Sequence, residues 1–251
     1  MKNLPLVSII TPSYNSAPYI KETIESVLQQ THSNWEMIIV DDCSTDKSRD
    51  IIAEYSKQDS RIKLLKNKIN LGVAKSRNCA IKEAEGDYIA LLDSDDIWLS
   101  NKLEKQLELM QKENVLMSFS AYNTINEDGE EIGFFPINEK VTYSDMLKTS
   151  SIGTLTTIYN AKKLGKLYFD EIGHEDYLYK LNILKQIDYA QGIKEPLAKY
   201  RIVQSSLSSN KIKAALWQWK IYRDIEKIPL FKSIYYFINY TYNGLTKYRP
   251  R

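Results

Sequence analysis

The sequence is poor in cysteine and glycine, and both shortages exclude classes of site. It has two cysteines, Cys43 and Cys79, in unrelated segments without a Cys-x-x-Cys spacing. We therefore expect two reduced thiols in the core, and neither a disulfide framework nor a zinc site. Only nine glycines and seven prolines occur among 251 residues, with no low-complexity run. This composition is that of an ordinary folded protein.

Long apolar runs are also missing. The first residues, "MKNLPLVSIITPSYN", hold an apolar stretch of only about six residues, too short for a signal peptide or a membrane span. We therefore expect a protein of the cytosol. Its length suffices for a sizeable core, either as one α/β domain or as a domain with a helical appendage.

Charge is divided unevenly along the chain. Residues 211–251 contain nine Lys or Arg and two acids, a net charge of +7, whereas the whole chain carries +2. Residues 1–210 therefore carry −5, and the basic part is the carboxyl-terminal end.

The first hundred residues alternate strand-like and helix-like patterns, which predicts βαβ units and a mainly parallel sheet. Four strands are expected at 6–11, 35–41, 61–66 and 88–93, with helices following at 16–28, 46–57 and 73–85. Ser16 and Asp46 are candidate helix caps. Polar clusters follow the strands, and in open parallel sheets ligands bind outside the carboxyl ends of the strands.

The second half is mixed. We expect a helix at 102–114, strands at 115–125, 151–160 and 195–203, and a helix from about Glu175. "NEDGEE" contains an Asp-Gly turn of the kind that closes a hairpin. Two further helices are expected at 211–227 and 230–245, after a boundary near residue 205.

The stretch "YIALLDSDDIWL", residues 88–99, ends an apolar run with three aspartates in four positions. On an extended backbone Asp93 and Asp95 lie about 6.6 Å apart on the same side. At an effective dielectric near 20 they repel each other by roughly 2.5 kcal/mol. A partner that offsets this repulsion is expected.

Several segments together carry a resemblance to a known family. These are "VSIITPSYNSAPYIKETIESVLQQT", "EMIIVDDCSTDKS", "NLGVAKSRNCAIKEAEGDYIALLDSDD" and "HEDYLYKLNIL". In this order they resemble the motifs of inverting family 2 glycosyltransferases with the GT-A fold, over about residues 5–205. The closing stretch is similar to that of bacterial enzymes that build O-antigen, capsule or teichuronic acid.

The resemblance implies a domain organisation. Residues 1–205 form a GT-A catalytic domain with a Rossmann-like, mainly parallel sheet flanked by helices. Its first half, about 1–100, binds the nucleotide-sugar, and its second half, about 101–205, binds the acceptor. Residues 206–251 form a basic, aromatic helical segment.

The family also implies a role for the aspartate cluster. Asp95 or Asp96 contacts a Mg²⁺ or Mn²⁺ ion that neutralises the donor diphosphate, and Asp93 or its neighbour reaches the ribose hydroxyls. This ion is the partner that the repulsion calls for. The alternative is a solvated strand end, with Asp96 as a helix cap.

Further nucleotide contacts follow from the earlier motifs. The resemblance assigns Asp42 to the imide N–H of uracil, whereas nucleotide binding and a structural role are equally open for Asp41. Thr11 and Tyr14 are expected in the first strand-to-helix loop, where they cradle base and ribose, although Tyr14 could equally pack in the core.

The segment "NLGVAKSRN" supplies two cations. Lys75 and Arg77 lie near the start of a helix that the resemblance places beside the nucleotide, and Arg77 is our choice for a contact to base or phosphate. A solvated basic side of the helix is the alternative.

An inverting transfer needs a general base that deprotonates the acceptor hydroxyl. The resemblance points to Asp176 in "GHEDY", although a first-turn carboxylate is also a common helix cap. Glu175 is a weaker, supporting candidate. His174 is left out of the metal set because a single histidine is ordinarily structural.

The carboxyl-terminal segment interleaves aromatic and basic residues, which suits peripheral contact with an anionic membrane. Packing of an aromatic helix pair on the catalytic domain is the alternative. Nucleic acid is not an expected partner, since no recognition motif accompanies the charge.

The sequence thus predicts a metal-dependent inverting hexosyltransferase. It would act in bacterial surface polysaccharide synthesis at the inner face of the plasma membrane, moving a sugar from a UDP-sugar to a saccharide acceptor, for which a polyprenyl-diphosphate-linked saccharide is the candidate. A sugar nucleotidyltransferase and a Rossmann dehydrogenase are less suitable, because the loop "TPSYNSAP" lacks their glycines. A non-catalytic module that binds a nucleotide or glycan is the remaining alternative.

Overall fold

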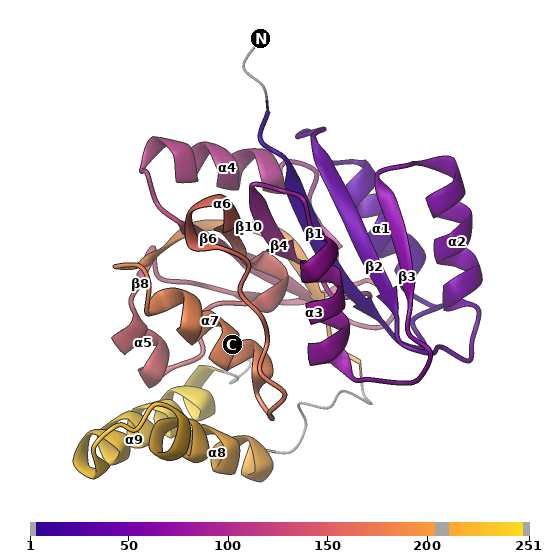
Figure 1. The fold of residues 1–251 in the computed structure, drawn as a ribbon. Coiled ribbons are helices and arrows are strands. Elements are labelled where there is room, and N and C mark those ends of the chain that lie inside the picture. Colours follow the sequence, from indigo (N-terminus) through magenta and orange to yellow (C-terminus); the bar gives the residue numbers. More distant parts are fainter. Residues whose placement is uncertain (1–3, 204–210, 248–251) are drawn as a thin grey trace.

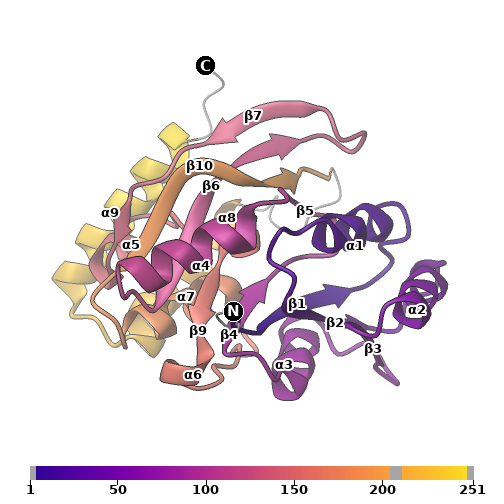
Figure 2. The same ribbon diagram turned by 90° about the horizontal axis from the view of Figure 1, so that it is seen from above.

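The computed structural model describes residues 4–203 and 211–247. A single twisted sheet runs through the molecule, and helices cover both of its faces (Figures 1 and 2). Its strand order is β3-β2-β1-β4-β9-β6-β10-β5, with β7 added beside β6 and β8 beside β10. The predicted α/β architecture is confirmed.

The first half follows the predicted alternation closely. Its elements are β1 (Val7–Ser13), α1 (Ile20–Leu28), β2 (Trp35–Asp41), α2 (Ser48–Gln58), β3 (Ile62–Lys66), α3 (Val73–Glu83) and β4 (Tyr88–Leu91). The four strands pair in parallel. β1, β2 and β4 are buried on both faces, which explains their apolar runs, whereas the edge strand β3 is only partly buried.

Two apolar clusters form the core, one on each face of the sheet. On one face Ile9 and Met37 pack with residues of α1, α2 and α4. On the other, Ile10 and Ile38 pack with residues of α3 and α7. Successive strand residues point to opposite faces, so the same strands hold both layers of helices.

The second half contributes β5 (Ile97–Trp98), α4 (Lys102–Lys112), β6 (Met117–Ile125), β7 (Glu131–Phe135), β8 (Lys140–Val141), α5 (Tyr143–Lys148), a 3₁₀ turn (Thr154–Thr156), β9 (Ile158–Asn160), α6 (Ala161–Leu164), α7 (Glu175–Leu184) and β10 (Ala190–Arg201). The hairpin β6–β7 turns at Gly129, which has φ +85°. The Asp-Gly turn is therefore confirmed.

The strand predicted at 151–160 is mostly wrong. Only Ile158–Asn160 is a strand, because the Thr156 amide and the hydroxyls of Thr156 and Thr157 donate to the carbonyl of Gly153, while the Thr157 amide donates to that of Thr154. Threonine hydroxyls that bond to nearby carbonyls compete with a sheet ladder.

Two helices close the described chain: α8 (Lys211–Lys220), continued by a π-helical turn (Ile221–Ile225), and α9 (Leu230–Lys247). They lie beside α5 and α7 in both views (Figures 1 and 2). Ile221 and Tyr222 are fully buried there. The predicted helical appendage is present and packs on the body, whereas the predicted boundary near residue 205 lies outside the described residues. Within the described residues, every helix is too short or too polar to span a bilayer.

Alanine substitutions at two glycines would test how tightly the chain packs against β1. A Cβ on Gly86 would lie 2.6 Å from the backbone nitrogen of Ser8, whereas a Cβ on Gly244, in α9, would meet nothing within 4 Å. Gly86→Ala is expected to lower the free energy of unfolding by about 1–3 kcal/mol, because backbone has to shift. Gly244→Ala is the control and should raise it by roughly 0.5–1 kcal/mol. Urea titrations of both variants measure the difference; equal values would contradict the packing.

Candidate active site

The direction of the strands brings polar loops to one edge of the sheet. β1, β2, β3 and β4 are parallel, β9 is antiparallel to both β4 and β6, and β10 is parallel to β6. Six strands therefore run the same way, and their carboxyl ends share one edge. This edge is where a parallel sheet places its ligand crevice.

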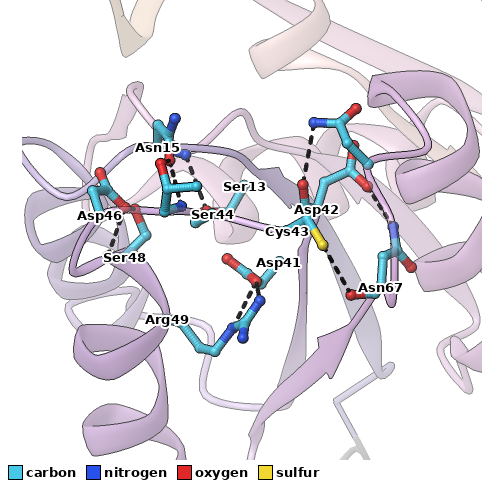
Figure 3. A network of polar contacts seen from close by, with 12 residues as sticks. Ser13, Asn15, Asp41, Asp42, Cys43, Ser44, Asp46, Ser48, Arg49 and Asn67 are labelled. Carbon is cyan, nitrogen blue, oxygen red and sulfur yellow. Dashed lines mark hydrogen bonds and ion pairs between the residues drawn. The ribbon is translucent and has the colours of Figure 1, made fainter.

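The loops after β1 and β2 are tied together (Figure 3). Asn15 accepts a hydrogen bond from the Thr45 backbone nitrogen at 2.8 Å, and its own backbone nitrogen donates to Ser44 Oγ at 3.0 Å. Asn15 and Cys43 both have positive φ, 48° and 66°. Such conformations are costly outside glycine and concentrate at functional sites.

Asp42 anchors the next loop along the edge. Its carboxylate accepts hydrogen bonds from the backbone nitrogens of Leu71 and Gly72, both at 2.8 Å, and from the Asn67 side chain at 2.7 Å (Figure 3). The side chain is 3% exposed. Asp42 thus shapes the entry to α3, a task that the sequence did not reveal, and its contact to uracil stays a prediction.

Asp41 has a structural partner. Its Oδ2 accepts from Arg49 Nη2 at 2.6 Å and from Nε at 2.9 Å, and the carboxylate is fully buried. Of the two roles left open for Asp41, the ion pair is the one that this geometry displays (Figure 3). Asp46 accepts from the backbone nitrogen of Ser48, the first residue of α2, although the residue at the N-cap position is Lys47 rather than the predicted Asp46.

Thr11 lies differently from the prediction, whereas Tyr14 lies in the loop after β1 as predicted. Thr11 is inside β1 and fully buried, not in the loop, because pairing with β2 continues to Ser13. Tyr14 is 53% exposed, so its alternative place in the core is wrong. Ser16 does not cap α1 with its side chain; its hydroxyl pairs with Ser13 instead.

The aspartates after β4 separate into distinct environments. Asp93 accepts from Arg77 Nη2 at 2.6 Å. Asp95 is partly exposed, and burial together with Asp93 raises its pKa to about 6. Asp96 is 1% exposed, and its Oδ1 accepts from the backbone nitrogen of Arg201 at 3.0 Å. Of the two predicted metal ligands, Asp95 is therefore the one with an accessible side chain.

Arg201, at the end of β10, holds this acidic loop from the far side of the site. Its Nε donates to the carbonyl of Asp95 at 3.0 Å, and Nη2 pairs with Glu22 of α1 at 2.5 Å. Its Nη1 donates to two carbonyls in the β6–β7 turn, those of Asn126 and Glu127. The sequence analysis missed Arg201; a cation at the carboxyl end of a predicted strand was the available signal.

Arg77 joins the acidic loop to the segment that carries the candidate base. Beyond its bond to Asp93, its Nη1 lies 3.4 Å from Glu175 Oε1. The guanidinium also lies over the Phe169 ring, 5.0 Å from its centroid. Arg77 is only 4% exposed, so the alternative of a solvated basic side is wrong for it.

Lys75, by contrast, lies on the surface of the same helix. Its ammonium pairs with Glu171 at 3.0 Å, and both side chains are well exposed. Its predicted contact with the nucleotide remains a prediction.

Asp176 is held by a buried lysine. Its Oδ2 accepts from Lys180 Nζ and from Thr154 Oγ1, both at 3.0 Å, and Lys180 also donates to the carbonyl of Ile152. Burial alone would raise the pKa of the Asp176 carboxyl, but Lys180 and Arg77 outweigh it and hold that pKa well below its usual range. The carboxylate is therefore ionised at neutral pH. Lys180 and Thr154 were not identified from sequence.

The residues before Asp176 set the start of α7. His174 has φ +62° in the left-handed region and makes no side-chain cap, and burial lowers its pKa. Burial and Asp176 raise the pKa of Glu175. The structure thus gathers Arg77, Asp93, Glu175 and Asp176 in one ionic group.

A divalent cation fits the accessible end of this group. Within the described ranges, no set of three or more His, Cys, Asp or Glu side chains is placed to hold a metal by itself. Asp93 and Asp95 offer hard oxygen ligands, and Mg²⁺ or Mn²⁺ is commonly held by one or two carboxylates together with substrate phosphates. Burial and the neighbouring Asp93 raise the pKa of Asp95, and a divalent cation bound beside it would favour its ionised form.

Comparison with known proteins identifies the family. The model of glycosyl transferase family 2 matches residues 8–164. A Bacillus subtilis (strain 168) protein described as putative teichuronic acid biosynthesis glycosyltransferase TuaG is 45% identical over 245 residues, 97% of each chain. The Escherichia coli UDP-Glc:alpha-D-GlcNAc-diphosphoundecaprenol beta-1,3-glucosyltransferase WfgD is 43% identical over 244 residues, 97% of this chain and 95% of WfgD. The chain belongs to glycosyl transferase family 2 and is a glycosyltransferase.

Solved structures support the fold. The S. aureus TarS 1–349 structure in complex with UDP has a TM-score of 0.73 at 20% identity, covering 96% of this chain and 72% of that one. The mannosyltransferase PcManGT from Pyrobaculum calidifontis, in complex with GDP-Man and Mn²⁺, has a TM-score of 0.67 at 17% identity, covering 91% and 66%. The GT-A fold predicted from the motifs is confirmed.

The two cations of α3 provide a matched test of the ionic group. Arg77→Met leaves Asp93 and Glu175 without their shared partner, and we expect a loss of about 1–3 kcal/mol in unfolding free energy. Lys75→Met removes an exposed pair and should cost less than about 0.5 kcal/mol. Denaturant unfolding of both variants tests this; an Arg77→Met protein as stable as the wild type would contradict the bridge.

Proposed function

We propose that this protein transfers a hexosyl residue from a UDP-sugar to a saccharide acceptor with inversion, in the synthesis of a bacterial surface polysaccharide. The observation that carries the proposal is the Arg77 bridge, which joins the acidic strand end to the segment of Asp176. In a sugar transfer, the donor diphosphate would lie beside the acidic strand end, and the acceptor hydroxyl would lie beside Asp176.

The names of the relatives support the choice of donor and acceptor. TuaG is named for teichuronic acid biosynthesis, and WfgD and WfaP for transfer from UDP-Glc to a diphosphoundecaprenol-linked sugar. Identities of 39–45% over nearly the whole chain extend beyond the nucleotide-binding half. We therefore favour a UDP-sugar donor and an acceptor on a polyprenyl diphosphate, at the inner face of the plasma membrane.

Asp176 is the proposed general base. Its Oδ2 is held by Lys180 and Thr154, which leaves Oδ1 to accept the proton of the acceptor hydroxyl. As that proton moves to Asp176, the acceptor oxygen attacks the anomeric carbon, and the bond from this carbon to the diphosphate breaks on the opposite side. The electron pair leaves with UDP, so a single displacement inverts the anomeric centre.

The acidic strand end is the proposed diphosphate side. Asp95, with Asp93 beside it, would hold Mg²⁺ or Mn²⁺, which when bound neutralises the charge of the leaving diphosphate. Arg201 and Arg77 fix the backbone and side chains of this loop. Asp42, through its bond to the Gly72 amide, and Arg49, through its pair with Asp41, hold the neighbouring loops, which would receive the uracil of the donor.

Replacing the proposed base separates binding from transfer. Asp176→Asn keeps the size and loses the proton acceptor, so we expect unchanged UDP affinity by calorimetry and a fall of about 10²–10⁴ in the transfer rate. Asp170→Asn, an exposed carboxylate on the preceding loop, is the control and should transfer normally. An Asp176→Asn enzyme with near-normal transfer would require another base.

The metal role is tested by binding and needs no turnover. Mn²⁺ should tighten UDP binding to the wild type, as measured by calorimetry with and without chelator, and this gain should vanish in Asp95→Asn. Asp50→Asn, on the exposed side of α2, should keep the gain. If chelator left the UDP affinity of the wild type unchanged, the proposed role of a divalent cation in binding the diphosphate would be wrong.

A further inference from the structure

The outward side of α9 carries large apolar side chains that solvent reaches. Seven of the fifteen exposed large hydrophobic side chains in the described residues lie between Leu216 and Tyr242. Four of them recur at helical spacing: Phe231, Ile234, Tyr235 and Ile238, exposed by 86%, 41%, 53% and 62%. Residues three, four and seven apart share one side of a helix. These four residues are the outer face of α9.

The opposite side of α9 holds the helix against the body. Ser233 is fully buried, the Phe237 ring packs edge-on against Trp219, and Asn243 donates to the carbonyl of Lys148 in α5. Since this side is occupied, the outer face is fixed in orientation and points away from the catalytic domain. A helix that is apolar on both sides needs a second apolar surface.

The surrounding charge favours an anionic surface over a second copy of the chain. Residues 211–251 carry a net charge of +7, and Lys220, Lys227 and Lys232 are exposed around α8 and α9. Two copies joined through this face would bring two such basic segments together. Aromatic and aliphatic side chains flanked by lysines match the interfacial zone of a bilayer with anionic lipid.

We propose that the outer face of α9 docks on an anionic bilayer, with the helix lying in the plane of the membrane. The inference deepens the proposed function, on which it rests for a lipid-linked acceptor. Phe231 and Ile238 enter the apolar zone, while Tyr235 and the lysines stay at the headgroups. On this proposal the inner side of α9 packs on the catalytic domain and its outer side contacts the membrane, so the two alternatives drawn from the sequence apply to opposite sides of one helix.

The docked helices also touch the catalytic loop. Trp217 of α8 packs against Gly173, where an added Cβ would lie 2.3 Å from the indole. Gly173 precedes His174, Glu175 and Asp176. α8 therefore links the loop of the proposed base to α9, the helix that would meet the bilayer, and this would bring the site near an acceptor anchored in the same membrane.

Flotation with vesicles tests the surface in the full-length protein. The wild type should float with vesicles containing phosphatidylglycerol, and less with pure phosphatidylcholine or in high salt. Phe231→Asp with Ile238→Asp should lower the partition at least about tenfold, since two apolar side chains are lost and two negative charges gained. Thermal melts check that both proteins are folded.

A matched control makes the same chemical change elsewhere. Ile132 and Phe134 of β7 are also exposed, by 55% and 53%, and Ile132→Asp with Phe134→Asp should float as the wild type does. Equal flotation of the two double variants, or a wild type that stays with neither vesicle, would overturn the proposal. Dimers of the wild type that the α9 variant breaks, without flotation, would instead identify a second copy as the occupant and overturn it too.

Activity separates this inference from the proposed function. The α9 variant should transfer sugar to a short soluble acceptor as the wild type does, and lose at least about tenfold on a lipid-linked acceptor in vesicles. Flotation itself requires no donor, so a wild type that floats but transfers nothing would refute the proposed reaction while leaving the docking surface intact.

Discussion

The arrangement of this site depends on one buried cation. Arg77 lies at the centre of a group of carboxylates that would otherwise repel one another: Asp93 on one side and Glu175 on the other, with Asp176 close enough to affect its charge. A planar guanidinium can bind two carboxylates at once, which an ammonium does less well. The group therefore ties together two distant segments of the chain, the end of β4 and the start of α7.

The sheet explains how these segments meet. Because six strands run in one direction, the carboxyl ends of β1, β2, β3, β4, β6 and β10 share one edge. Arg201 uses this edge to connect the acidic loop with α1 and with the β6–β7 turn. Buried charges are stable only when they are paired and hydrogen-bonded, and Arg77, Arg201 and Lys180 each satisfy several acceptors. Asp95, unlike its buried neighbour Asp96, keeps a partly exposed side chain.

Much of the fold could be predicted from the sequence because its signals are local. Apolar runs predicted the four parallel strands, and an Asp-Gly pair predicted the β6–β7 hairpin.

The features that the sequence did not predict depend on tertiary contacts. Asp96 is adjacent to Asp95 in sequence yet turns inward to the Arg201 amide, and Thr156 and Thr157 turn back to donate to the carbonyl of Gly153 instead of extending the strand. Asp42 resembled a ligand contact and is also the anchor of a loop twenty-nine residues further on. No periodicity reveals which of two neighbouring acids faces inward.

The central claim is that Asp95 and Asp176 are two sides of one site held by Arg77. A crystal structure with UDP and Mn²⁺, using the anomalous signal of manganese, tests it most directly. The account predicts a manganese peak bonded to the Asp95 carboxylate and to the diphosphate, with Asp176 facing the same space across the Arg77 bridge. A peak on other residues, or UDP bound away from residues 93–96, would contradict it.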